Sequence, residues 1–326
     1  MPETFPGINF NEDNICNFCL NFKGEEKLNE EKAVYLDKFK KLIEGLKGKN
    51  DYDCTLSYSG GKDSTYTLYL LREFFKLRVL ALTMDNSFMS DQAFGNIRTV
   101  TENLGVDSLV FKPDFKIMKK IFGHGVRNPM YSKKALERAS TICTSCIGLV
   151  KFIFLKIALE KAIPIMAWGW SPGQAPIRSS IMKINPAFFK AAQKALKGPM
   201  REVAGDGIDS YFIKDSDFDT AVSFPYNVSP LAFIDYNEET IIEKIRELGW
   251  VAPEDVDTNS TNCLMNSFAN QVHIDIHGFH PYVFEIAGMV RQGILSRDDG
   301  LKKIEEPGND AIIDYTRRKL ELKKEE

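Results

Sequence analysis

The stretch that decides the fold is YSGGKDSTY, from Tyr58 to Tyr66. It follows a short run at 53–58 that is typical of a strand and leads into STYTLYLLREFFK (64–76), whose pattern predicts a helix. Backbone amides in a glycine-rich turn at a helix N-terminus form an anion site. Gly60 and Gly61 let the oxygens of an anion approach the main chain, so the turn predicts a phosphate site.

The side chains of the same turn point to nucleotide chemistry. Lys62 adds a mobile positive charge, and Ser59 and Ser64 supply hydroxyl donors. Asp63 would repel a phosphate, but it becomes sensible if it binds Mg²⁺ or caps the helix. We expect Lys62 and Asp63 to be the catalytic residues of a nucleotide site.

The turn does not match the ordinary P-loop of kinases and GTPases. That motif needs glycine where Leu56 stands and serine or threonine where Asp63 stands. A plain glycine turn between a strand and a helix is the simpler alternative. The length of the string and its place between a strand and a helix favour the nucleotide site.

Strands and helices alternate along the first half of the chain. Further strands are predicted at 78–84, 107–112 and 163–168, with helices at 90–105 and 146–162 between them. This order predicts an α/β fold with a doubly wound parallel sheet. After Ser171 the alternation stops. We expect an N-terminal segment with a helix (1–50), a nucleotide-binding domain (51–225) and a mainly helical C-terminal region (226–326).

The composition is that of a globular protein. The 326 residues are 44% hydrophobic, which is enough for a core, and the net charge of −3 gives no global basic field for nucleic acid. No apolar run approaches the roughly 18 residues that span a bilayer. The acidic N-terminus lacks the apolar core of a signal peptide, so we expect a cytoplasmic protein.

SGGKDS resembles the signature of the N-type ATP pyrophosphatases, also called the PP-loop or adenine nucleotide α-hydrolase superfamily. The resemblance implies a Rossmann-like, HUP-type fold and an enzyme that cleaves ATP between the α and β phosphates, adenylates a substrate oxygen and lets a nucleophile displace AMP. It implies that Asp85 and Asn86, after the second strand, approach the adenosine. The residues it assigns to ATP and Mg²⁺ in the loop are Ser59, Gly60, Gly61, Lys62, Asp63 and Ser64.

The cysteines suggest a metal centre. Cys143 and Cys146 form a CxxC pair at the start of an apolar helix, the usual half of a metal site. The thiolation enzymes of the superfamily, which sulfurate tRNA, resemble this arrangement. That resemblance implies that the pair and the distant Cys263 hold a 4Fe–4S cluster with one iron left open. A buried cysteine pair and an unrelated core cysteine are the alternative.

Two other groups of possible ligands stand apart from that set. Cys16 and Cys19 supply half of a Zn²⁺ site, so they need partners elsewhere, such as another subunit, or the site is degenerate. On a strand, His273, Asp275 and His277 would share one face. That face either binds a metal or holds satisfied polar residues near a substrate pocket.

Several strings resemble one branch of the superfamily, the N-acetyl sugar amidotransferases of surface-polysaccharide (lipopolysaccharide) synthesis. They are PGINFNEDNICNFC (6–19), YDCTLSYSGGKDSTY (52–66), CTSC (143–146), IPIMAWG (163–169) and GILSRDDGLKKI (293–304). The resemblance implies a small sugar-type acceptor whose acetamido oxygen is adenylated, ammonia from a partner glutaminase subunit, and a homo-oligomer. WGWSPGQAPIRSS (168–180) and GFHPYVFEIAG (278–288) depart from the pattern of this branch.

Two other functions remain open. Sulfur transfer to a tRNA base or a small molecule would use the cluster, and the basic helix expected at 183–204 could meet RNA phosphates, although a solvated helix face explains it equally well. The third is an ATP-binding module without turnover. Lys62 and Asp63 argue against it, because a sensor does not need a site for a pyrophosphate leaving group.

Overall fold

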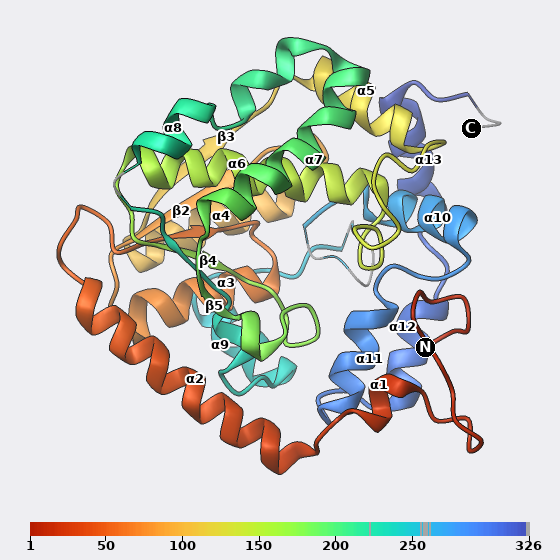
Figure 1. The fold of residues 1–326 in the computed structure, drawn as a ribbon, viewed down its shortest axis with the longest axis horizontal. Coiled ribbons are helices and arrows are strands. Elements are labelled where there is room, and N and C mark those ends of the chain that lie inside the picture. The colour runs from red at the N-terminus through yellow and green to blue at the C-terminus, as the bar shows by residue number, and fades with distance from the viewer. Residues whose placement is uncertain (222, 255, 257–259, 261, 324–326) are drawn as a thin grey trace.

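A six-stranded sheet forms the centre of the protein, seen here in a computed structural model (Figure 1). The structure describes residues 1–221, 223–254, 256, 260 and 262–323. The strand order is β3-β2-β1-β4-β6-β5, and all neighbours are parallel except β5, which runs antiparallel to β6. The strands are β1 (Cys54–Ser57), β2 (Val79–Met84), β3 (Asp107–Phe111), β4 (Ile165–Trp168), β5 (Ile181–Lys183) and β6 (Tyr226–Val228).

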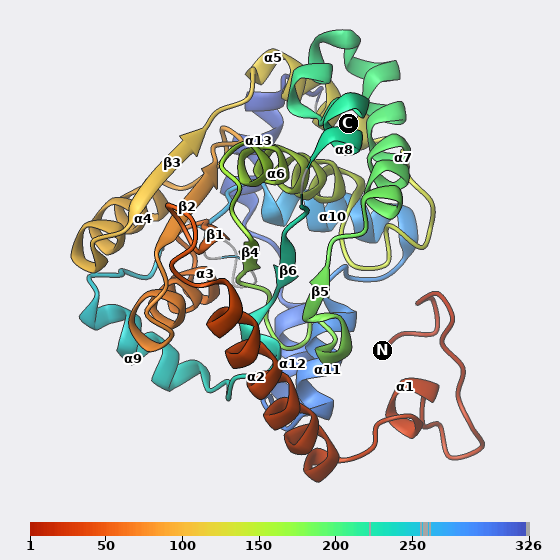
Figure 2. The same cartoon turned by 60° about the vertical axis from the view of Figure 1, so that its left-hand side comes forward.

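Helices cover both faces of this sheet, as Figure 2 shows from a second side. One face packs α5 (Phe115–Gly125), α6 (Thr141–Glu160) and α7 (Pro186–Ala204). The other packs α2 (Glu25–Leu46), α3 (Lys62–Tyr69), α4 (Asp91–Leu104) and α9 (Glu238–Glu247). Strand β2 shows why both faces are dry: Leu80, Leu82 and Met84 enter one core, and Val79 and Ala81 enter the other. The predicted α/β, doubly wound parallel sheet is confirmed.

Local signals set the ends of the helix between β2 and β3. The Ser90 side chain accepts a hydrogen bond from the amide of Ala93, which satisfies a free donor at the helix start. Gly105 ends α4 in the left-handed conformation, which costs glycine little. The predicted helix at 90–105 is therefore confirmed as α4.

The remaining elements are short or C-terminal. They are α1 (Asn17–Leu20), a π-helical turn at Leu70–Phe74 that continues α3, the 3₁₀ turns Ile177–Ser179, Asp206–Tyr211 and Pro230–Ala232, α8 (Asp215–Thr220), α10 (Asn266–His277), α11 (Val283–Arg291), α12 (Arg297–Glu305) and α13 (Asp310–Leu320). Strand β6 joins the sheet just beyond residue 225, where the sequence places a domain boundary. The division into three regions stays a prediction.

Two expectations from the sequence are wrong. The stretch around His273 is the helix α10, because its apolar side chains recur at helical spacing and pack on α6 and α13. Helix α6 is long and apolar enough to cross a membrane by length and composition, with a mean hydropathy of 2.0, contrary to the expectation that no run approaches that length. Half of this apolar stretch of α6 is buried inside the fold, where α6 packs on the sheet and on α5, α7 and α10.

Phe39 tests the core on the α2 face. Its ring is fully buried and contacts the rings of Phe75 and Phe233 at centroid distances of 4.9 and 5.6 Å. We expect Phe39→Ala to lower the free energy of unfolding by about 3–5 kcal/mol, because it removes apolar contact and leaves a cavity. Chemical denaturation measures this value. Phe188→Ala, at a side chain that is 69% exposed, is the matched control and should change it little; equal losses in the two variants would contradict this account of the core.

Candidate functional site

The glycine-rich turn lies between the end of β1 and the start of α3. Gly60 has a φ of +71°, and a Cβ atom there would lie 2.4 Å from the carbonyl oxygen of Ala93. No side chain fits at this position. Gly61 caps α3 in an extended conformation, so the free amides of the first turn of α3 face the loop, the arrangement that binds phosphate.

The two serines of the loop hold each other. Their hydroxyl oxygens are 3.1 Å apart, and the Ser64 hydroxyl donates to the carbonyl of Gly61 at 3.0 Å. Gly169, just after β4, allows the start of α3 to approach, because a Cβ there would lie 2.6 Å from the Cα of Ser64. The loop is thus fixed against the carboxyl ends of β1 and β4 before any ligand arrives.

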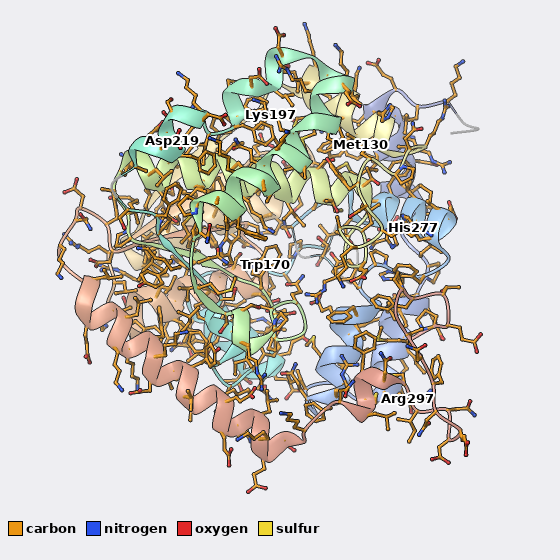
Figure 3. The ribbon with its side chains drawn as sticks, in the orientation of Figure 1. Met130, Trp170, Lys197, Asp219, His277 and Arg297 are labelled. Carbon is orange, nitrogen blue, oxygen red and sulfur yellow. The ribbon has the colours of Figure 1, made fainter. Side chains whose placement is uncertain are left out.

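A cavity of about 330 Å³ opens at these strand ends, the usual ligand position in an open α/β sheet. Ser59, Gly61, Asp63 and Ser64 form its base. Thr83 and Met84 reach it from β2, and Trp170, which lies near the middle of the molecule in Figure 3, reaches it from the loop after β4. The volume is in the range of small-molecule sites.

Lys62 is not among the described residues that line this cavity. Its ammonium nitrogen lies 3.1 Å from Asp63 Oδ1, 3.4 Å from Glu238 Oε1 and 2.5 Å from the hydroxyl of Tyr236. That hydroxyl donates to Asp63 Oδ1 at 2.7 Å. Burial alone lowers the pKa of Lys62, but the charges of Asp63 and Glu238 outweigh it and raise the pKa above its ordinary value, so the ammonium is charged.

The side chains of Asp85 and Asn86 line different hollows, although the two residues are neighbours in the chain. Asp85 lines a second hollow, where its Oδ2 lies 2.8 Å from the ammonium of Lys112. Asn86 lines the loop cavity. The expected approach of Asp85 to the adenosine therefore stays a prediction, and the structure brings Asn86, not Asp85, to the loop cavity.

The structure brings Cys143, Cys146 and Cys263 to the wall of the same cavity, where Asn86, just after β2, contacts two of the sulfurs. The Ser140 hydroxyl caps α6 by accepting from the amide of Cys143, which fixes the CxxC pair on the first turns of the helix. Cys263 comes from a segment that pairs with Met89, after β2. Three thiols from two distant parts of the sequence therefore line one cavity.

Burial raises the pKa of all three thiols, that of Cys143 to about 12, and their mutual repulsion as thiolates adds to the rise at Cys143 and Cys146. The amide of Asn86 donates to the sulfurs of Cys146 and Cys263 at 3.5 and 3.7 Å. An amide donor shared by two sulfurs is the type of hydrogen bond that thiolates or the sulfides of a cluster accept. Within the described residues, however, no three side chains are gathered closely enough to hold a metal ion as they stand.

Cys16 and Cys19 lie elsewhere. Their sulfurs are 3.5 Å apart around the short helix α1, which Phe5 and Phe18 anchor to Phe284 of α11. The described part of the chain offers them no third metal ligand, so the zinc expected there stays a prediction.

His273, Asp275 and His277 do not form the expected strand face. On α10 the rings of His273 and His277 lie one turn apart, with centroids at 4.5 Å, while Asp275 points to another side and accepts from Gln271 at 2.7 Å. Burial lowers the pKa of His273 to about 3, so this ring is neutral. Figure 3 places His277 at the rim of the molecule, away from Trp170.

Sequence reasoning missed the part of the cavity wall that the C-terminal region supplies. Glu285 of α11 lines it and accepts a hydrogen bond from the Ser171 hydroxyl at 2.6 Å. Gly173 packs so tightly on α11 that a Cβ would lie 2.2 Å from the carbonyl oxygen of Glu285. Tyr282 and Asn266, joined by a 2.9 Å hydrogen bond, complete this wall. A single carboxylate in the apolar run YVFEIAG was the signal available in the sequence.

Comparisons with known proteins give a distant context. No family model matches the chain. The uncharacterized protein MJ1599 of Methanocaldococcus jannaschii is 26% identical over 304 residues, which cover 92% of this chain and 88% of that protein.

Two solved structures are similar at low identity. The U34-tRNA thiolase NcsA from Methanococcus maripaludis with its 4Fe–4S cluster matches with a TM-score of 0.39 and 15% identity, over 89% of this chain and 80% of that chain. The NMN synthetase from Francisella tularensis matches with a TM-score of 0.38 and 12% identity, over 91% and 97%. Both TM-scores are below 0.5, which is too low to assign either activity to this chain.

Glu285 gives the site a testable pH dependence. Burial, and then the charge of Asp63, raise the pKa of Glu285 to about 7 from 4.5, so the folded protein binds this proton more tightly than the unfolded chain does. Its ionisation therefore lowers the stability of the fold as pH rises from about 4.5 to 7. We expect Glu285→Gln to gain stability relative to wild type between pH 5 and pH 8, by up to about 3 kcal/mol.

Urea denaturation at the two pH values measures this difference. Glu239→Gln, at an exposed position in the first turn of α9, is the control and should show no such pH-dependent gain. A constant difference between Glu285→Gln and wild type across this range would contradict the raised pKa.

Proposed function

We propose that this protein is an ATP-dependent enzyme that transfers AMP to a carbonyl-type oxygen of a small acceptor and then replaces AMP with a nitrogen nucleophile. The observation that carries the proposal is the SGGKDS turn at the base of a cavity with a separate polar wall. The turn offers amides and hydroxyls to phosphate, and the polar wall leaves room for an acceptor beside it.

The first step is adenylation. The acceptor oxygen attacks the α-phosphorus, a new oxygen–phosphorus bond forms, and the bond to the bridging oxygen breaks as pyrophosphate leaves. The amides of Gly61 and the start of α3 hold the departing phosphates, and Ser59 and Ser64 donate to them. Asp63 would hold a Mg²⁺ ion, which neutralises charge on the phosphates when it is bound.

The second step is displacement. The nitrogen attacks the activated carbon, the new carbon–nitrogen bond forms, and the carbon–oxygen bond breaks to release AMP. An N-acetyl sugar fits as the acceptor, because Glu285, Tyr282, Asn266 and Gln174 can bind several hydroxyl and amide groups. Ammonia from a glutaminase subunit and a homo-oligomeric assembly belong to the same proposal.

Sulfur transfer is the second candidate, and the three thiols on the cavity wall favour it. If Cys143, Cys146 and Cys263 close around a 4Fe–4S cluster, the cluster would supply an open iron for sulfide. A tRNA substrate is less well supported, because basic residues of α7 are already paired: Lys197 and Arg201 lie 3.0 and 3.3 Å from the carboxylate of Asp209.

The loop residues test the ATP chemistry. We expect Lys62→Ala and Asp63→Ala each to lower AMP formation by about 100-fold or more, because each removes charge stabilisation of the leaving group. The assay measures AMP and pyrophosphate released from Mg²⁺–ATP, with UDP-N-acetylglucosamine and ammonium chloride, and separately with sulfide and tRNA. Wild-type rates in both variants would remove these residues from the mechanism.

The exposed pair Lys41 and Asp37 of α2 provides matched controls, because its charged atoms lie 2.7 Å apart, far from the loop. Lys41→Ala and Asp37→Ala should keep the wild-type rate. A wild-type protein that binds ATP but releases no pyrophosphate in any mixture would favour an ATP-binding module without turnover.

The cysteines test the second candidate. We expect protein purified without oxygen, or reconstituted with iron and sulfide, to absorb near 400 nm if the cluster forms, and Cys143→Ala to lose that absorbance because one of three ligands is gone. Cys54→Ala is the control, since Cys54 is a fully buried core residue of β1. A wild-type protein that stays colourless, with fewer than one iron atom per chain, would exclude the cluster.

A further inference from the structure

The glycine-rich turn contacts a segment of the C-terminal region, from Tyr236 to Val251. This segment supplies a charge and hydrogen bonds to the turn. Tyr236 follows the 3₁₀ turn at Pro230–Ala232, and Glu238 opens α9, which packs along α3 (Figures 1 and 2). At the other end of this segment the indole of Trp250 donates to the carbonyl of Gly60 at 2.9 Å. One C-terminal segment therefore contacts the loop at its lysine and at its glycine.

The same segment is tied to α4. Asn96 donates to the carbonyl of Val251 at 2.8 Å and accepts from its amide at 2.9 Å, and Asn96 also reaches the carbonyl of Gly60 at 3.4 Å. The loop, α4 and the segment therefore form one hydrogen-bonded unit behind the phosphate site.

The side chain of Lys62 points away from the cavity that its neighbours in the turn line. Asp63 and Ser64, which follow it, line the cavity, but Lys62 does not; its side chain is 11% exposed and lies against Tyr236 and Glu238. The ammonium also lies 5.1 Å from the centre of the Tyr236 ring. A phosphate in the cavity needs this charge, and two carboxylates and a phenol hold it elsewhere.

We propose that Tyr236 and Glu238 are positioning residues that hold Lys62 in a resting place outside the cavity, and that a nucleoside triphosphate binds by drawing Lys62 away from them. The inference rests on the proposed function, because it takes the cavity as the site of the triphosphate. Binding exchanges one set of anionic partners for another, so part of the binding free energy is spent on releasing Lys62. Tyr236 and Glu238 thereby set the nucleotide affinity from outside the glycine-rich turn.

The test measures binding of Mg²⁺ with α,β-methylene ATP, in which the bond to be cleaved is blocked, by isothermal titration calorimetry. Glu238→Gln removes one of the resting charges, and Tyr236→Phe removes the hydroxyl but keeps the ring. We expect each to bind the analogue about fivefold to tenfold more tightly than wild type, since a hydrogen bond to a charged group is lost only in the resting state. Adenosine, which has no phosphates for Lys62 to meet, should bind all variants with wild-type affinity.

Glu239→Gln is the matched control, one residue away and exposed, and should leave both affinities unchanged. The side chain of Glu238 is 39% exposed, so we expect Glu238→Gln to fold. If Tyr236→Phe does not fold, Glu238→Gln alone tests the inference. Unchanged or weaker binding of the analogue to Glu238→Gln, with wild type binding normally, overturns this inference and leaves the proposed function standing. Failure of wild type to bind the analogue overturns both.

Discussion

The site depends on the absence of a side chain at residue 60. The turn from β1 to α3 lies so close to α4 that a Cβ atom at residue 60 would clash with the carbonyl oxygen of Ala93, at a distance of 2.4 Å. This contact fixes where α3 begins, and hence where its free amides point. The carbonyl of the same residue, Gly60, accepts from the indole of Trp250, which ties the C-terminal segment to the glycine-rich turn.

The cavity has walls of different origin and different chemistry. The strand ends and the loop supply amides, hydroxyls and Asp63, which suit a nucleotide. The C-terminal helices supply Glu285 and Tyr282, which suit a smaller polar molecule. A parallel sheet gathers its carboxyl ends at one edge, so the wall made by the loop and the strand ends follows from the topology of the sheet, whereas the second wall exists only because α10 and α11 fold back over that edge.

The two CxxC pairs have the same spacing in the sequence but lie in different surroundings in the fold. Cys143 and Cys146 are fixed by the start of α6, and Cys263 is held beside Met89 by pairing between segments that follow β2 and α9. Because they share the cavity with the loop, chemistry at the sulfurs and chemistry at the phosphates would meet in one space. Cys16 and Cys19, an identical spacing in sequence, lie in a separate aromatic cluster with Phe5 and Phe18.

The sequence by itself determined the features that depend on near neighbours: the glycine turn, the alternation of strands and helices, the Ser90 cap and the Gly105 stop. These are encoded by residues within a few positions of one another. The tertiary structure decided the rest. It separated Asp85 from Asn86, turned Lys62 toward Tyr236 and Glu238, and placed Glu285 in the wall of the loop cavity. Each of these outcomes depends on contacts between residues that are distant in the chain, and local pattern carries no information about such contacts.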